Sequence, residues 1–89
     1  MAAAESRVTV YVTRRCGYCH LAMDLLRARG IAFRAIDLTD DDDARDALVE
    51  RTQWRTMPVV LIDDELVGGH RELVQLDRTG ELARRVSSG

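Results

Sequence analysis

The sequence predicts a single α/β domain over residues 1–89, in which helices flank both faces of a four-stranded mixed β-sheet. Three observations lead to this fold class. Segments with strand and helix periodicity follow one another in the order β-α-β-α-β-β-α. A helical segment separates the first two strands, and a right-handed crossover makes such strands parallel. A two-residue turn separates the last two strands, which makes them an antiparallel hairpin.

The first half of the chain contains two predicted strands around a predicted helix. β-Branched and aromatic residues alternate over Val8–Val12, which predicts a strand, and a short loop follows at Thr13–Arg15. Apolar side chains then recur at helical spacing from about Tyr18 to Arg29, and Gly30 supplies a helix stop. Residues 31–38 are mostly apolar and predict the second strand.

A second helix is expected from Thr39 and Asp40 to about Thr52. Its first turn contains the acidic run Asp40–Asp43, which could be mistaken for a metal-binding loop. Carboxylates stabilise the positive end of a helix, and the run lacks the glycine and the spaced ligands of a calcium loop. The acidic run therefore favours a helix start over a metal site.

A hairpin is predicted next. The apolar run Val59–Ile62 follows Met57-Pro58 and is short enough for a buried strand. Asp63-Asp64 can turn the chain into Glu65–Val67, the hairpin partner, and Gly68-Gly69 then breaks that strand.

Two helical segments complete the chain. The first runs from His70 to about Thr79, and Gly80 separates it from a last short helix that contains Leu82 and Val86. The chain has no repeat and no linker, so one domain is expected.

Composition excludes several classes of function. The formal net charge of −2 argues against general affinity for nucleic acids or membranes. The first residues lack the basic start and apolar region of a secretory signal, and no stretch approaches the roughly 20 apolar residues of a membrane span. We therefore expect a cytoplasmic protein. In that compartment a cysteine pair is more often catalytic or metal-binding than a structural disulfide.

The two cysteines lie in Cys16-Gly17-Tyr18-Cys19, between the first strand and the first helix. A helix N-terminus stabilises a thiolate through unpaired N–H groups and the macrodipole, and Arg14 and Arg15 add positive potential. The spacing of two residues brings both sulfurs to one helical turn, where they can close a disulfide. Cys16 is predicted as the exposed nucleophile and Cys19 as the resolving thiol.

Three other interpretations of the cysteine pair are weaker. Cys16–His20 also spells Cys-x-x-Cys-His, the signal for haem attachment, but that chemistry normally needs export and a second axial ligand. A structural zinc site takes about four ligands, and only His20 and His70 could supplement the cysteines. An inert buried pair is uncommon at a helix start beside two arginines.

The sequence resembles the glutaredoxin family over nearly its whole length. Three motifs in the family's order carry the resemblance: Cys16–His20 after the first strand, Thr56-Met57-Pro58 before the third, and Gly68-Gly69 before the third helix. The resemblance implies a thioredoxin-like fold. It also implies a cis peptide between Met57 and Pro58, which would bring the Met57 backbone close to the sulfurs, where it can pair with an incoming cysteinyl group.

The resemblance further implies how glutathione would bind. Arg14, Tyr18 and Arg55 match positions near the glycyl carboxylate of glutathione, and Thr56 belongs to the same groove. The turn Gly69-His70-Arg71 matches N–H groups that meet the γ-glutamyl carboxylate, a role that suits a helix N-terminus. Glu72 falls where family members often carry an aspartate that pairs with the glutamyl ammonium.

The function implied is glutathione-dependent reduction of glutathione mixed disulfides and protein disulfides by a monomer. Two alternatives stay open. A glycine after the first cysteine also occurs in glutaredoxins that hold a [2Fe–2S] cluster between two protomers, and Cys16 would then be the protein's ligand. Mycothiol-using relatives share Cys-Gly-Tyr-Cys. Arg71-Glu72 replaces a frequent acidic pair, so the thiol is the least determined part of the prediction.

Overall fold

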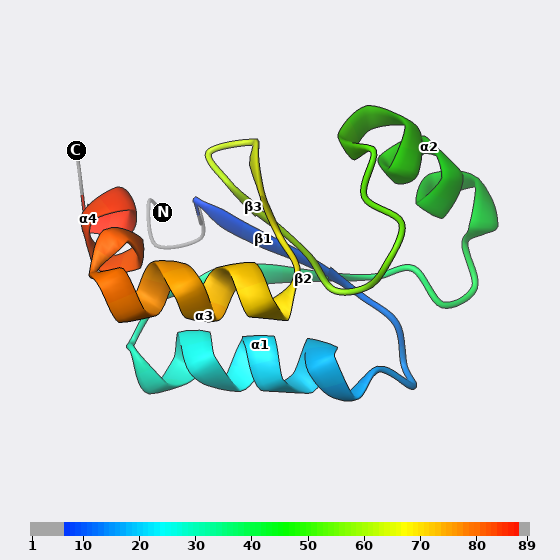
Figure 1. Ribbon diagram of the computed structural model, residues 1–89. Helices are drawn as coiled ribbons and strands as arrows, with labels where there is room; N and C mark the ends of the chain where they lie inside the picture. Colours follow the sequence, from blue (N-terminus) through cyan, green and yellow to red (C-terminus); the bar gives the residue numbers. More distant parts are fainter. Residues whose placement is uncertain (1–6, 88–89) are drawn as a thin grey trace, which may run out of the picture.

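The computed structural model describes residues 7–87 as a four-stranded sheet of order β2-β1-β3-β4 with helices on both faces (Figure 1). β1 pairs with β2 in parallel and with β3 antiparallel, and β3 and β4 form the antiparallel hairpin. The predicted fold class is confirmed. The elements are β1 (Val8–Val12), α1 (Gly17–Ala28), β2 (Phe33–Asp37), α2 (Asp42–Thr52), β3 (Val59–Ile62), β4 (Glu65–Gly68), α3 (His70–Thr79) and α4 (Glu81–Ser87).

Several boundaries differ from the prediction for local reasons. β2 is shorter than residues 31–38, because the Ile31 N–H donates to Leu26 O and closes the end of α1. α2 begins later than Asp40, because Asp41 is its N-cap and accepts the Ala44 N–H. Gly68 does not break the second hairpin strand but ends it, at a φ of 125° that favours glycine.

The larger core lies between the sheet and the layer formed by α1, α3 and α4. Figure 1 shows α1 and α3 side by side on one side of the sheet. Alternate residues of β1 and β3 point into this core because side chains of a strand alternate between faces. Its buried members are Val8, Val10, Val12, Cys19, Ala22, Met23, Leu26, Val60, Ile62, Leu73 and Leu82.

The smaller core lies on the opposite face, under α2 (Figure 1). Its buried members are Leu38, Leu48, Val59 and Leu61, and only Leu48 comes from α2 itself. Met57 packs against both cores. The residue before Pro58 is therefore held from both sides of the sheet. Over residues 7–87, no helix has the length and apolar character needed to cross a membrane.

Candidate functional site

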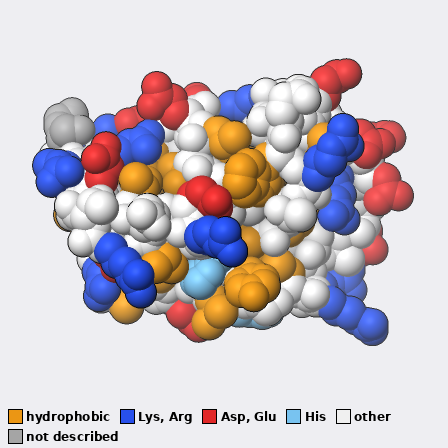
Figure 2. All heavy atoms as spheres, in the orientation of Figure 1, with side chains coloured by type: hydrophobic (Ala, Val, Ile, Leu, Met, Phe, Trp, Pro, Cys, Tyr) orange, Lys and Arg blue, Asp and Glu red, His pale blue; other side chains and the backbone are white. Residues whose placement is uncertain are grey.

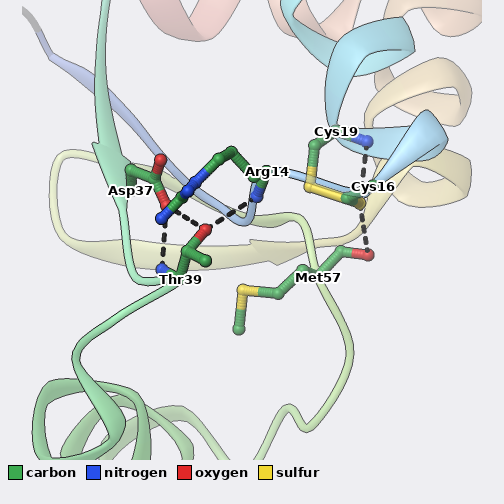
Figure 3. The surroundings of a disulfide bond; sticks show 6 residues. All are labelled: Arg14, Cys16, Cys19, Asp37, Thr39 and Met57. Carbon is green, nitrogen blue, oxygen red and sulfur yellow. Dashed lines mark hydrogen bonds between the residues drawn. A yellow bond between two sulfur atoms is a disulfide. The ribbon is translucent and has the colours of Figure 1, made fainter.

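The two cysteines form a disulfide at the start of α1, with their Cα atoms 5.2 Å apart (Figure 3). Cys16 is the N-cap of α1, and its sulfur accepts a hydrogen bond from the Cys19 N–H at 3.1 Å. Cys16 is half-buried, whereas Cys19 is 0% exposed and belongs to the larger core. An N–H group aimed at the Cys16 sulfur at a helix N-terminus favours the thiolate of that residue.

The peptide between Met57 and Pro58 is cis, as the family resemblance implied. The Met57 carbonyl oxygen lies 3.5 Å from the Cys16 sulfur, and Figure 3 shows the Met57 backbone facing the disulfide. A backbone segment at this distance can pair with the main chain of a group joined to the Cys16 sulfur.

A groove of about 620 Å³ begins beside the disulfide and continues onto α3. This volume is typical of sites for small molecules. Most residues predicted to bind a thiol line it: Tyr18, Thr56, Met57, Pro58, Gly69, His70, Arg71 and Glu72. The Tyr18 and His70 rings, with centroids 5.6 Å apart, flank one end.

Two predicted residues, Arg14 and Arg55, are absent from this groove. The Arg14 guanidinium forms an ion pair with Asp40, and its side chain points toward Asp37 and away from the disulfide (Figure 3). Arg55 lines a separate depression beside two carboxylates, those of Asp46 and Glu50. That these two arginines bind glutathione, as the family resemblance implies, stays a prediction.

Four groove residues were not predicted: Trp54, Val74, Gln75 and Arg78. Three of them share a face of α3 with Arg71, because residues three, four and seven positions apart lie on one side of a helix. That spacing was visible in the sequence. The indole N–H of Trp54 is buried and has no hydrogen-bond partner among the described residues.

At the start of α3, one backbone N–H group donates a hydrogen bond to a side chain, and the next three have no acceptor within the helix. The Gly69 N–H donates to the Glu72 carboxylate at 2.9 Å, so Glu72 fastens the turn instead of standing free. The N-cap is a glycine and supplies no side-chain acceptor. The next N–H groups, of His70, Arg71 and Glu72, have no partner within the helix. Such N–H groups at a helix start can bind an anion, and these three residues line the groove.

No group of three or more histidine, cysteine, aspartate or glutamate side chains within residues 7–87 could hold a metal ion. A cluster at Cys16 would therefore need ligands from outside one chain. Reduction of the Cys16–Cys19 disulfide would restore both thiols for reaction.

A cysteine pair at a helix start beside a cis-proline, on a sheet of this order, defines a protein of the thioredoxin-like class. The glutaredoxin family model matches residues 8–67. A probable glutaredoxin of Synechocystis is 31% identical over 81 residues, which cover 90% of this chain and 92% of the relative. Glutaredoxin 3 of Escherichia coli is 31% identical over 77 residues, 86% of this chain and 93% of the relative.

Solved structures agree with these relatives. The buckwheat glutaredoxin–glutathione complex has a TM-score of 0.85 and 30% identity, over 91% of this chain and 76% of that one. Wheat glutaredoxin has a TM-score of 0.87 and 30% identity, over 94% and 82%. The chain belongs to the glutaredoxin family, whose members are generally thiol–disulfide oxidoreductases.

Proposed function

We propose that this protein is a glutathione-dependent oxidoreductase that reduces glutathione mixed disulfides and protein disulfides through Cys16 and Cys19. One observation carries the proposal. The half-buried Cys16 sulfur lies between a donated N–H and the carbonyl of Met57, and Met57 lines a groove that passes the N-terminus of α3. The likeness to the buckwheat complex supports the choice of glutathione.

The reaction begins with the Cys16 thiolate. It attacks the glutathione sulfur of a mixed disulfide, and the protein thiolate leaves. A second glutathione thiolate then attacks the Cys16 adduct, which releases oxidised glutathione and restores Cys16. On a protein disulfide, Cys19 can instead displace the bound substrate sulfur and close the disulfide that the structure contains.

Glutathione recognition would use the part of the groove between Met57 and the start of α3. The γ-glutamyl carboxylate suits the N–H groups of His70, Arg71 and Glu72. One oxygen of Glu72 is bound to Gly69, and the other can face the glutamyl ammonium. Tyr18, Thr56, Met57 and Pro58, which line the groove, would contact the cysteinyl and glycyl part.

The proposal is tested with Cys16→Ser and Cys19→Ser on a glutathionylated peptide. We expect the Cys16 variant to lose turnover and the Cys19 variant to keep much of it, because a second glutathione replaces the resolving cysteine. The assay follows release of the peptide thiol, with unmodified protein in each run. Equal loss in both variants would contradict the monothiol route.

The identity of the thiol needs its own comparison. Parallel assays with glutathione and mycothiol, at matched thiol concentration, should give faster turnover with glutathione. Faster turnover with mycothiol would support the alternative that the sequence left open. The cluster-bridged dimer and the cytoplasmic location stay predictions.

A further inference from the structure

The groove extends beyond the part that a tripeptide thiol would occupy. Its far section is lined by Val74, Gln75 and Arg78 on α3, together with Trp54. From Arg71 to Arg78 the helix rises about 10 Å, or two turns. This section mixes apolar and polar side chains along an open surface, which suits an extended peptide better than a second small molecule.

Two arginines of this groove have no carboxylate partner among the described residues, whereas several other arginines of the chain have one. Arg29, Arg84 and Arg85 each form an ion pair. Within residues 7–87, no ion pair involves Arg71 or Arg78. Both are exposed, and Figure 2 shows blue side chains over the face of α3 with hydrophobic surface beside them.

The acidic groups facing this surface do not neutralise it. Glu72 lies in the groove, but its carboxylate accepts the Gly69 N–H. Asp77 is on the same helix and is bound to Arg29 through both oxygens. Two unpaired cations therefore face one carboxylate that is partly satisfied. The protein as a whole has a net charge of −2, so this positive surface is local.

We propose that the outer face of α3 is a docking surface for an acidic peptide segment that flanks the target disulfide of a protein substrate. Acidic side chains of that segment would pair with Arg71 and Arg78, while its backbone follows the groove from Met57 along α3. The inference rests on the disulfide-exchange part of the proposed function and not on the choice of glutathione.

The exchange step needs no added reductant in a single turnover. The reduced protein supplies two thiols. Cys16 attacks one sulfur of the peptide disulfide and releases the first peptide thiolate. Cys19 then attacks the Cys16 sulfur, which releases the second peptide thiol and leaves the Cys16–Cys19 disulfide. Two electrons pass from the protein to the peptide.

The test uses three synthetic peptides with one internal disulfide and the same length, whose flanking residues are glutamate, glutamine or lysine. Rates of a single turnover are measured by acid quenching and mass spectrometry. At low ionic strength we expect the acidic peptide to react about three- to ten-fold faster than the neutral one, as two exposed ion pairs would allow. The lysine peptide should be slowest, and salt should compress all the differences.

Arg78→Gln and Arg34→Gln form a matched pair of variants. Arg34 is also exposed and forms no ion pair within the described residues, but it lies on β2, at the opposite edge of the sheet from β4. The acidic-to-neutral rate ratio should fall about two-fold or more in Arg78→Gln and stay unchanged in Arg34→Gln. If the rate ratio fell equally in both variants, the preference for acidic peptides would come from the net charge of the protein and not from Arg78. That result would overturn the proposal.

The two proposals fail in different ways. If the glutamate and glutamine peptides react at equal rates at low ionic strength, the docking surface is wrong while disulfide exchange stands. If no peptide disulfide is reduced by the dithiol protein, the exchange activity itself is wrong.

Discussion

The two faces of the sheet are unequal in how firmly they are packed. The face under α1, α3 and α4 buries eleven residues in its core, whereas the face under α2 buries four. Cys19 belongs to the larger core, and the opposing Met57 touches both. Cys19, the proposed resolving cysteine, is thus fixed in the more extensively packed core, while α2 is attached mainly through Leu48.

The largest expected effect comes from breaking each core with the same substitution. Leu26 is 0% exposed in the larger core, and Leu48 is 5% exposed in the smaller one. Leu26→Ala should lower the free energy of unfolding by about 4 kcal/mol, because the surrounding layers cannot close the cavity. Leu48→Ala should cost about 2 kcal/mol, because α2 can shift toward the sheet. Urea unfolding measures both, and equal costs would contradict the comparison.

The same inequality explains which parts of the fold the sequence could predict. The strands Val8–Val12 and Val59–Ile62 have strong apolar patterns, and both form at the predicted bounds. The start of α2 lies in a run of four aspartates, each of which could serve as N-cap. Local sequence cannot choose Asp41 among them.

The candidate site shows a similar division. The three short motifs lie together because the end of β1, the start of β3 and the end of β4 are at the same end of these antiparallel strands. Arg14 was predicted beside the groove, whereas its side chain forms an ion pair with Asp40 and does not line the groove. The helical spacing of the groove residues on α3 was visible in the sequence, but their approach to Trp54 was not, because the two segments meet only after the chain folds.

A smaller effect distinguishes the two adjacent glycines where the hairpin enters α3. Gly68 has a φ of 125°, and an added Cβ would lie 2.8 Å from the Glu72 Cγ. Gly68→Ala should therefore cost about 2 kcal/mol and detach Glu72 from Gly69. At Gly69 an added Cβ would meet neighbours from both sides of the sheet, Glu72 and Trp54, at ordinary distances of 3.5 and 3.6 Å.

Gly69→Ala is thus the control for Gly68→Ala. Thermal unfolding should show a clear loss for the first glycine and a minor one for the second. A larger loss of Tm for Gly69→Ala would contradict this prediction. It would mean that the surroundings of Gly69, between Glu72 and Trp54, are tighter than those of Gly68.

The smallest expected effect comes from removing the charge of one carboxylate, either Asp77 on α3 or Asp37 at the end of β2. The Arg29 guanidinium donates two hydrogen bonds to Asp77 and holds the pKa of that carboxyl below its usual range. At the end of β2, the Thr39 hydroxyl and N–H lower the pKa of Asp37. A carboxyl with a depressed pKa stabilises the folded protein above its unfolded pKa of about 4, and this contribution is lost as pH falls through the folded pKa.

Asp77→Asn should therefore lower the Tm by about 2–5 °C at pH 7, and the difference from the unmodified protein should close as pH falls from about 5 to 2. Asp37→Asn should change the Tm less, because an asparagine oxygen still accepts from Thr39. Added salt should shrink the Asp77 effect more than the Asp37 effect, since Asp77 depends on an ion pair with Arg29, whereas Asp37 depends mainly on hydrogen bonds from Thr39. Thermal unfolding of both variants and of the unmodified protein, at two pH values and two salt concentrations, measures these differences in Tm. If the Asp77 effect persists unchanged at pH 2, the Arg29 ion pair is not its cause, and the layer of α1, α3 and α4 is held at that end by packing alone.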